Sequence, residues 1–194
     1  MQISKESLDT IFNAARTYHG WLDTPVEDSL LKQVYDLMKF GPTSMNCGPA
    51  RIVFIKSKEA KERLKPCVAA FNVEKTMAAP VTAIVAYDLN FYEKMDVLWP
   101  HADAVSIFKG NDKLVTETVL RNSSLQGAYF MIAARSLGLD CGPMSGFNAA
   151  TLDQEFFPEG TIKSNFLCNL GYGDPTTLYP RGARLAFDDV CEIV

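Results

Sequence analysis

Residues 112–137 constrain the fold more than any other part of the chain. This stretch contains no proline and carries apolar side chains on more than one side of a helical projection. Such a pattern is typical of a helix that is buried all round, and Gly138, directly after it, is a common helix end. The chain has 194 residues, which is enough for one compact domain with a sizeable core. We therefore expect a single domain, residues 1–194, built around a central helix.

Shorter elements are expected around this helix. Apolar spacing and capping residues predict further helices after Ser4, after Pro25-Val26, from Ser57 to Pro66, over 71–77, and from Asn148 or Thr151 to Pro158. Runs of apolar, largely β-branched residues predict strands at 52–55, 81–87 and 165–170. We expect residues 88–112 to be irregular and the last twenty residues to form an extended tail.

Composition argues against several classes of partner. The chain has 19 Lys and Arg against 23 Asp and Glu, so it lacks the basic field that holds a nucleic-acid backbone. No apolar run approaches the roughly 20 residues that cross a bilayer, and the N-terminus is acidic where a signal peptide is basic. Five cysteines without a C-x-x-C pair favour reduced thiols. We expect a cytoplasmic protein with no nucleic-acid or membrane partner.

Motifs of common enzyme classes are incomplete. The segment 171–176 has the first two glycines of a dinucleotide-binding motif, with Thr176 at the place of the third, and it leads into a proline-bearing tail rather than a helix. In the segment 142–146, Ser145 stands one place too late for the nucleophile elbow of a hydrolase. His19 and His101 are the two histidines, and neither has the spacing of a metal-binding cluster. The sequence therefore predicts no Rossmann domain, hydrolase or metal site.

Polar residues gather instead at turns, each after an amphipathic segment. The clusters are Arg16, Thr17 and His19; residues 42–46; Asn72 and Lys75; residues 142–146; and Arg181 and Arg184. Asn72 and Lys75 are three residues apart and so share one helix face, and the two arginines suit a phosphate. Taken singly, each cluster is more often a cap, a turn or a solvated charge. Their joint order along the chain favours a common site.

That order resembles the FMN-dependent nitroreductase family, in particular its short branch that contains the malonic semialdehyde reductases of pyrimidine breakdown. The resemblance spans nearly the whole chain. It implies an α+β fold in which helices surround a mixed, mainly antiparallel sheet. It also implies a homodimer whose chains exchange C-terminal arms, here about residues 173–194, so that two flavins lie at the interface.

The resemblance also implies roles for the clusters, with FMN as cofactor and NADH or NADPH as reductant. The residues implied at the flavin phosphate, ribityl chain or their charged surroundings are Arg16, Thr17, His19, Arg181 and Arg184. The residues implied to reach the flavin from the other subunit are Pro42, Thr43, Ser44 and Asn46. The residues implied at the ring system are Asn72 and Lys75 at its pyrimidine edge, and Pro143, Met144, Ser145 and Gly146 near N5. No side chain is implied as a nucleophile.

Departures from the family pattern concern the substrate side more than the flavin side. Ala15 stands where the family often has a first arginine, and His19 where a second basic residue is common. Gly48-Pro49-Ala50 replaces Gln-Pro-Trp, and Ser145 replaces a glutamate of the larger nitroreductases. We expect reduction of a small oxo-acid such as malonic semialdehyde. Three alternatives stay open: a nitro-compound or quinone reductase, a flavin-binding protein without turnover, and a dimeric scaffold whose clusters are caps and turns.

Overall fold

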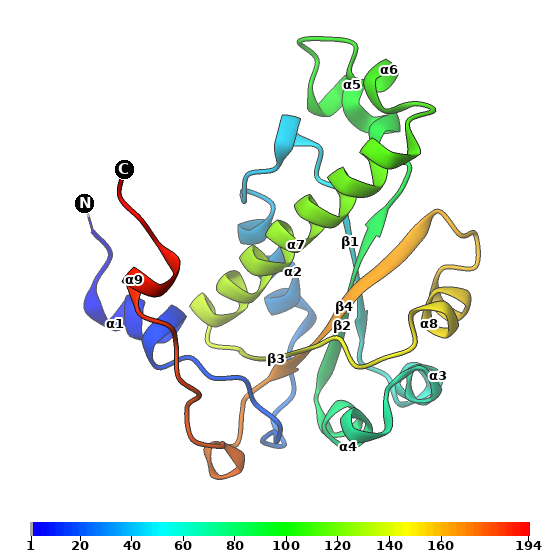
Figure 1. Cartoon of the computed structure of the whole chain (residues 1–194). Helices are drawn as coiled ribbons and strands as arrows, with labels where there is room; N and C mark the ends of the chain where they lie inside the picture. The colour runs from blue at the N-terminus through cyan, green and yellow to red at the C-terminus, as the bar shows by residue number, and fades with distance from the viewer. Residues whose placement is uncertain (1) are drawn as a thin grey trace.

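A single four-stranded sheet forms the centre of the computed structural model, which describes residues 2–194 (Figure 1). The strands are β1 (Ala50–Ile55), β2 (Val81–Asp88), β3 (Asp140–Met144) and β4 (Ile162–Gly171). They lie in the order β1-β2-β4-β3, and each neighbouring pair is antiparallel. A parallel bridge joins Thr17 to Cys141 at the β3 edge. The predicted α+β class is confirmed.

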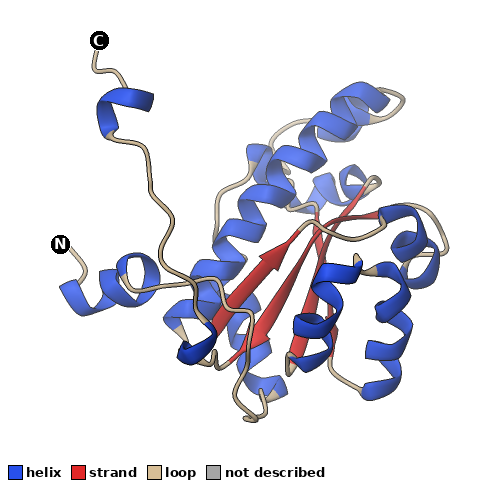
Figure 2. Ribbon diagram, turned by 60° about the horizontal axis from the view of Figure 1, so that its bottom comes forward, coloured by secondary structure: helices blue, strands red, loops and turns tan. Residues whose placement is uncertain are grey.

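Helices cover both faces of the sheet (Figure 2). The helices of residues 2–194 are α1 (Lys5–Leu8), α2 (Asp28–Met38), α3 (Lys58–Leu64), α4 (Ala70–Ala78), α5 (Met95–Leu98), α6 (Ala104–Phe108), α7 (Asp112–Ser136), α8 (Ala149–Phe156) and α9 (Phe187–Val190). Of these, α2 and α7 pack on one face of the sheet and α3, α4 and α8 on the other, whereas α1 and α9 lie away from the sheet (Figure 1). Strand β2 packs against the helices on both faces of the sheet, because its successive side chains point to opposite faces. Val81 and Val85 pack with α2 and α7, whereas Ile84 and Ala86 pack with α3 and α8. Within residues 2–194, no helix has the length and apolar character needed to cross a membrane.

The long helix predicted over 112–137 is confirmed as α7. Phe130 on its inner side is fully buried against the sheet. On its outer side, Leu120, Leu125 and Tyr129 are 43%, 45% and 38% exposed. The expectation of burial all round is therefore wrong for the single chain. The exposed side of α7 thus carries large apolar side chains beside charged ones such as Glu117 and Arg121, and a second chain could cover these apolar side chains.

Strand β3 replaces part of the turn predicted at 142–146. Pro143 is tolerated because β3 is the last strand of the sheet, where one side of the backbone lacks a full ladder. Gly142 lies where the segment around Tyr18 approaches β3 closely. There the backbone N–H of Tyr18 donates to the carbonyl of Cys141, the residue before Gly142, at 3.2 Å. A Cβ atom on Gly142 would lie 2.8 Å from the carbonyl oxygen of Tyr18. The glycine thus marks a close approach between two segments rather than a turn.

We expect Gly142→Ala to lower the free energy of unfolding by roughly 1 to 3 kcal/mol, as is typical when a methyl group is forced into a packed site. The obstructing atom belongs to the backbone, so no side chain can rotate away from it. Urea unfolding measures the effect. The matched control is Ser145→Ala, which changes an exposed side chain three residues further on. Equal stability of Gly142→Ala and wild type would contradict the close approach.

Residues 88–112 contain more regular structure than expected. A 3-10 turn, Phe91–Lys94, leads into α5, and α6 follows shortly after. Phe91, Met95 and Phe108 are buried together with Val119 of α7 and form a small separate core. The apolar residues here belong to several single-turn helices, so no periodic pattern is long enough to predict them.

Both ends of the chain are less regular than the body. The first predicted helix is only α1, which passes into a π-helical turn, Asp9–Asn13. The predicted extended tail is confirmed: after β4 it contains a 3-10 turn, Pro175–Thr177, and the single turn α9. From residue 179 onward its side chains are exposed, and Figure 2 shows it leaving the body of the molecule.

Candidate functional site

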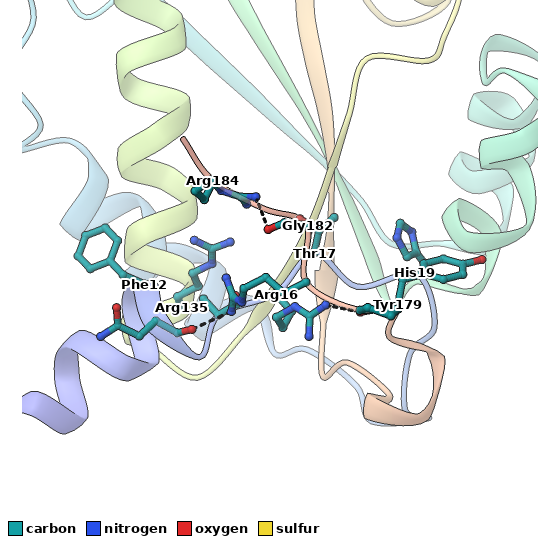
Figure 3. A pocket seen from close by; sticks show the side chains of 12 residues that line it. Phe12, Arg16, Thr17, His19, Arg135, Tyr179, Gly182 and Arg184 are labelled. Carbon is teal, nitrogen blue, oxygen red and sulfur yellow. Dashed lines mark hydrogen bonds between the residues drawn. The ribbon is translucent and has the colours of Figure 1, made fainter. Parts of the chain in front are cut away.

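A cavity of about 630 Å³ lies between the segment after α1, the end of α7 and the tail (Figure 3). Four guanidinium groups line it: Arg16, Arg135, Arg181 and Arg184. None of the residues that line this arginine cavity is an aspartate or a glutamate. Guanidinium groups form bidentate, charge-assisted hydrogen bonds with phosphate oxygens. The arginine cavity is therefore suited to a phosphate.

Backbone carbonyls hold the arginines of the first segment and the tail. Arg16 donates to the carbonyl of Tyr179. Arg181 donates to the carbonyls of Asn13 and Ala15 at 2.7 Å and 2.9 Å, which ties the tail to the end of the first helical segment. Because these acceptors are neutral, the positive charges of Arg16 and Arg181 stay uncompensated. The structure thus brings the first cluster and the tail together in one cavity, and their contact with a flavin stays a prediction.

Arg135, near the end of α7, was not predicted. Its Nη1 donates to the carbonyl of Ile11 at 3.3 Å, whereas its buried Nε has no hydrogen-bond partner within residues 2–194. A buried N–H group without a partner is costly, and a bound anion could satisfy it. The sequence signal was weak because a basic residue in the last turn of a helix is explained by the helix dipole alone.

A second group of predicted residues meets where α4 faces the loop after β3. The Nδ2 of Asn72 donates to the carbonyl of Gly146 at 3.0 Å. A Cβ atom on Gly146 would lie 2.4 Å from that nitrogen, so this contact requires glycine. Ser145 and Gly146 form the loop as predicted, but Pro143 and Met144 belong to β3. The Met144 side chain packs in the core, so any contact of Met144 with a ligand would involve its backbone.

Lys75 presents a positive charge beside this contact. Within the described part of the chain, its ammonium group has neither a hydrogen-bond acceptor nor a carboxylate partner. Partial burial lowers the pKa of Lys75, because a charged group is less stable away from water. An unpaired cation at this place favours a negatively charged or electron-rich ligand.

The segment 16–21 connects the arginine cavity to α4. Thr17 bridges to Cys141, and the indole Nε1 of Trp21 donates to the carbonyl of Lys75 at 3.2 Å. His19 lines the arginine cavity. Burial, followed by repulsion from the Lys75 ammonium, lowers the pKa of His19, so its imidazole is neutral at neutral pH. The segment 16–21 therefore lies next to both groups of residues.

The remaining predicted residues lie elsewhere. Pro42, Thr43, Ser44 and Asn46 form the loop after α2 and do not line the arginine cavity. Ser44 N–H donates to Oδ1 of Asn122 on α7 at 2.8 Å, and Asn46 donates to the Leu98 carbonyl at 3.1 Å. Met45 and Asn46 have positive φ angles of 51° and 52°, which non-glycine residues seldom adopt. That this loop reaches the flavin of a second subunit stays a prediction.

Comparison with known proteins identifies the family. A family model described as the Nitroreductase family matches residues 2–172. This chain belongs to the nitroreductase family. It is similar to a Polynucleobacter asymbioticus protein named "Putative NADH dehydrogenase/NAD(P)H nitroreductase", with 56% identity over 192 residues, covering 99% of this chain and 98% of that one. A Burkholderia lata nitroreductase relative of the same designation is 58% identical over 191 residues, covering 98% of each.

Solved structures of nitroreductase relatives share the fold. A Bacillus subtilis protein described as a "putative nitroreductase" has a TM-score of 0.87 at 20% identity, covering 98% of this chain and 100% of that chain. A protein of the same description from Exiguobacterium sibiricum, in complex with FMN, has a TM-score of 0.86 at 19% identity, covering 100% and 99%. The predicted nitroreductase-like fold is confirmed.

Proposed function

We propose that this nitroreductase-family protein is an FMN-dependent NAD(P)H oxidoreductase that reduces a small electrophile. The arginine cavity is the observation that carries the proposal. Its four guanidinium groups face no carboxylate among the lining residues, and Arg135 offers a buried N–H group that lacks a partner. These donors fit the phosphate of FMN. The FMN complex of the Exiguobacterium relative and the NAD(P)H in the names of the bacterial relatives support the same cofactors.

The side chains around the site would bind and orient the flavin rather than react. The arginines and Thr17 would hold the phosphate and ribityl chain, and Asn72 and Lys75 would face the pyrimidine edge of the ring. When bound, FMN would supply hydride transfer between the nicotinamide and the substrate. The protein would contribute orientation, a positive charge at the ring edge and exclusion of water. No nucleophilic side chain is needed.

For the electron acceptor we propose malonic semialdehyde, reduced to 3-hydroxypropanoate. The support is the resemblance of the motifs to the short branch of the family, together with the departures at residues 48–50 and Ser145. A nitro compound or a quinone is the second candidate, favoured by the names of the relatives. Stopped-flow reduction by NADH and NADPH, followed by reoxidation with each acceptor, tests both. Preference for a nitroaromatic would overturn the proposal of a semialdehyde substrate. If no acceptor reoxidised the bound flavin, the protein would be a flavin-binding protein without turnover.

We also propose that the protein is a homodimer with exchanged tails. Leu185, Phe187 and Ile193 of the tail are 72%, 57% and 87% exposed, which is costly for a single chain. A second cavity, of about 1240 Å³, runs beside the open edge of β1 and is lined in part by Phe40 and Phe54. An exposed strand edge with an apolar groove beside it can accept an extended segment from another chain. The tail of a second chain has the required character.

We expect the purified protein to carry about one noncovalent FMN per chain. Arg184→Ala should weaken FMN binding by about one to two orders of magnitude, because a charge-assisted hydrogen bond contributes roughly 1.5 to 3 kcal/mol. Quenching of flavin fluorescence during titration of the apoprotein measures the affinity. Arg63→Ala on α3 is the matched control, since it removes an exposed arginine that does not line the arginine cavity. Wild-type affinity in Arg184→Ala would remove this residue from the site, and release of FAD would defeat the proposal.

A further inference from the structure

Lys61 on α3 is a lysine that the proposed site does not use, yet its side chain is only 4% exposed. Its ammonium donates to the carbonyl of Thr76 at 2.7 Å and to Oγ1 of Thr82 at 2.6 Å. Within residues 2–194, no carboxylate pairs with it. Burial lowers the pKa of Lys61 to about 8, so the group still carries its charge at neutral pH. Burying a charge without an ionic partner costs free energy of desolvation. This cost indicates that the contacts of Lys61 have a structural or functional role.

The ammonium of Lys61 lies at the C-terminal end of α4. In an α-helix, the Thr76 carbonyl would accept from the N–H of the residue four positions later, but that residue is Pro80, which has no N–H. Lys61 supplies the missing donor. A cation at this end of a helix is also favoured by the helix dipole. Lys61 therefore caps the helix that carries Asn72 and Lys75.

A chain of buried hydrogen bonds continues from Lys61 to the backbone of Lys75. Thr82 on β2 accepts from Lys61 and donates to Oδ1 of Asn169 on β4 at 2.7 Å. The Nδ2 of Asn169 then donates to the Lys75 carbonyl at 3.2 Å. Thr82 and Asn169 are fully buried and directly opposite each other in the sheet. Because each of these buried polar atoms has at least one hydrogen-bond partner, the series of bonds from Lys61 through Thr82 and Asn169 can hold α4 in one position on the sheet.

We propose that Lys61 is a positioning residue of the flavin site, which fixes the end of α4 and thereby the ammonium of Lys75. This inference rests on the proposed function, because that function places Lys75 at the flavin. Lys61 touches neither flavin nor substrate in this scheme. It acts through the Thr76 carbonyl and through the chain formed by Thr82 and Asn169.

The test compares the flavin midpoint potential in five FMN-loaded proteins: wild type, Lys61→Met, Lys75→Ala, the double variant, and Lys58→Met. Lys58 is an exposed lysine of the same helix and serves as the matched control. Methionine keeps the apolar stem of lysine but removes the ammonium donors. We expect Lys61→Met to lower the potential in the same direction as Lys75→Ala and by no more than Lys75→Ala does, and to change FMN affinity only modestly. In the Lys75→Ala background, Lys61→Met should lower the potential no further, and Lys58→Met should match wild type.

Two outcomes would overturn the positioning role. Lys61→Met could lower the melting temperature and leave the potential unchanged, which would make Lys61 purely structural. Its effect could also persist in full without Lys75, which would make it a direct electrostatic effect. Should Lys61→Met not fold, Thr82→Val breaks the hydrogen-bonded path to Asn169 while Lys61 keeps its bond to Thr76. An unchanged potential in Thr82→Val would then overturn the transmission from Lys61 to Lys75 through Thr82 and Asn169. Failure of wild type to bind FMN would instead refute the proposed site itself, and an unchanged potential in Lys75→Ala would remove Lys75 from that site.

Discussion

Replacing both Leu185 and Phe187 by aspartate is expected to separate the proposed dimer into monomers that bind FMN poorly. In the isolated chain these side chains are 72% and 57% exposed, so their apolar surface gains burial only on a partner. Each such side chain contributes roughly 1.5 to 3 kcal/mol when buried, and a buried unpaired carboxylate costs more. Arg184 remains in this variant. Loss of flavin would therefore report loss of assembly rather than loss of a phosphate ligand.

Sedimentation velocity at micromolar concentration measures the assembly, and flavin absorbance measures the occupancy. Ala150→Asp is the control, because it adds one aspartate at an exposed residue of α8, a helix that packs with α3 and not with the tail. This control should remain a flavin-loaded dimer. A double variant that still sediments as a dimer with bound flavin would show that the tail is not the shared element. A flavin-loaded monomer would contradict the shared site itself.

The buried elements were predictable from local pattern. Strand β2 reads as a nearly unbroken apolar run because helices cover both faces of the sheet. Strand β3 was not predictable in this way, since glycine and proline are as typical of a turn as of an edge strand. The choice between the two depends on the segment around Tyr18, which lies more than a hundred residues earlier. A contact between segments so far apart in the chain cannot be predicted from the residues around β3 alone.

The candidate site was predictable where its residues stand at the ends of elements. Arg16, Arg181 and Arg184 meet in one cavity as expected from the resemblance. Arg135 and Lys61 were not found because their surroundings in sequence are ordinary. Lys61 lies in the charged run 58–63, which is typical of a solvated helix, yet the fold buries it beneath α4. Only the tertiary position of Pro80 and Thr82 shows what this lysine does.

Lys75→Ala should make the bound flavin harder to reduce. Two-electron reduction adds negative charge at the pyrimidine edge, where the proposed site places the ammonium of Lys75. Since this ammonium has no acidic partner within the described residues, its field toward the ligand is not cancelled. A charge contact of this partly shielded kind is worth roughly 1 to 3 kcal/mol. For a two-electron couple, about 1.4 kcal/mol corresponds to about 30 mV, so the midpoint potential should fall by some tens of millivolts.

A redox titration against an indicator dye measures this fall, and stopped-flow reduction by NAD(P)H should show a slower hydride step. FMN affinity should change only modestly, because the oxidised ring carries no negative charge at that edge. Lys75→Arg should recover part of the potential, since it restores a cation with different geometry. Lys65→Ala, which removes an exposed lysine beyond α3, should leave the potential at the wild-type value. An unchanged potential in Lys75→Ala would mean that this ammonium lies in solvent, away from the flavin, and that the arginine cavity alone defines the cofactor site.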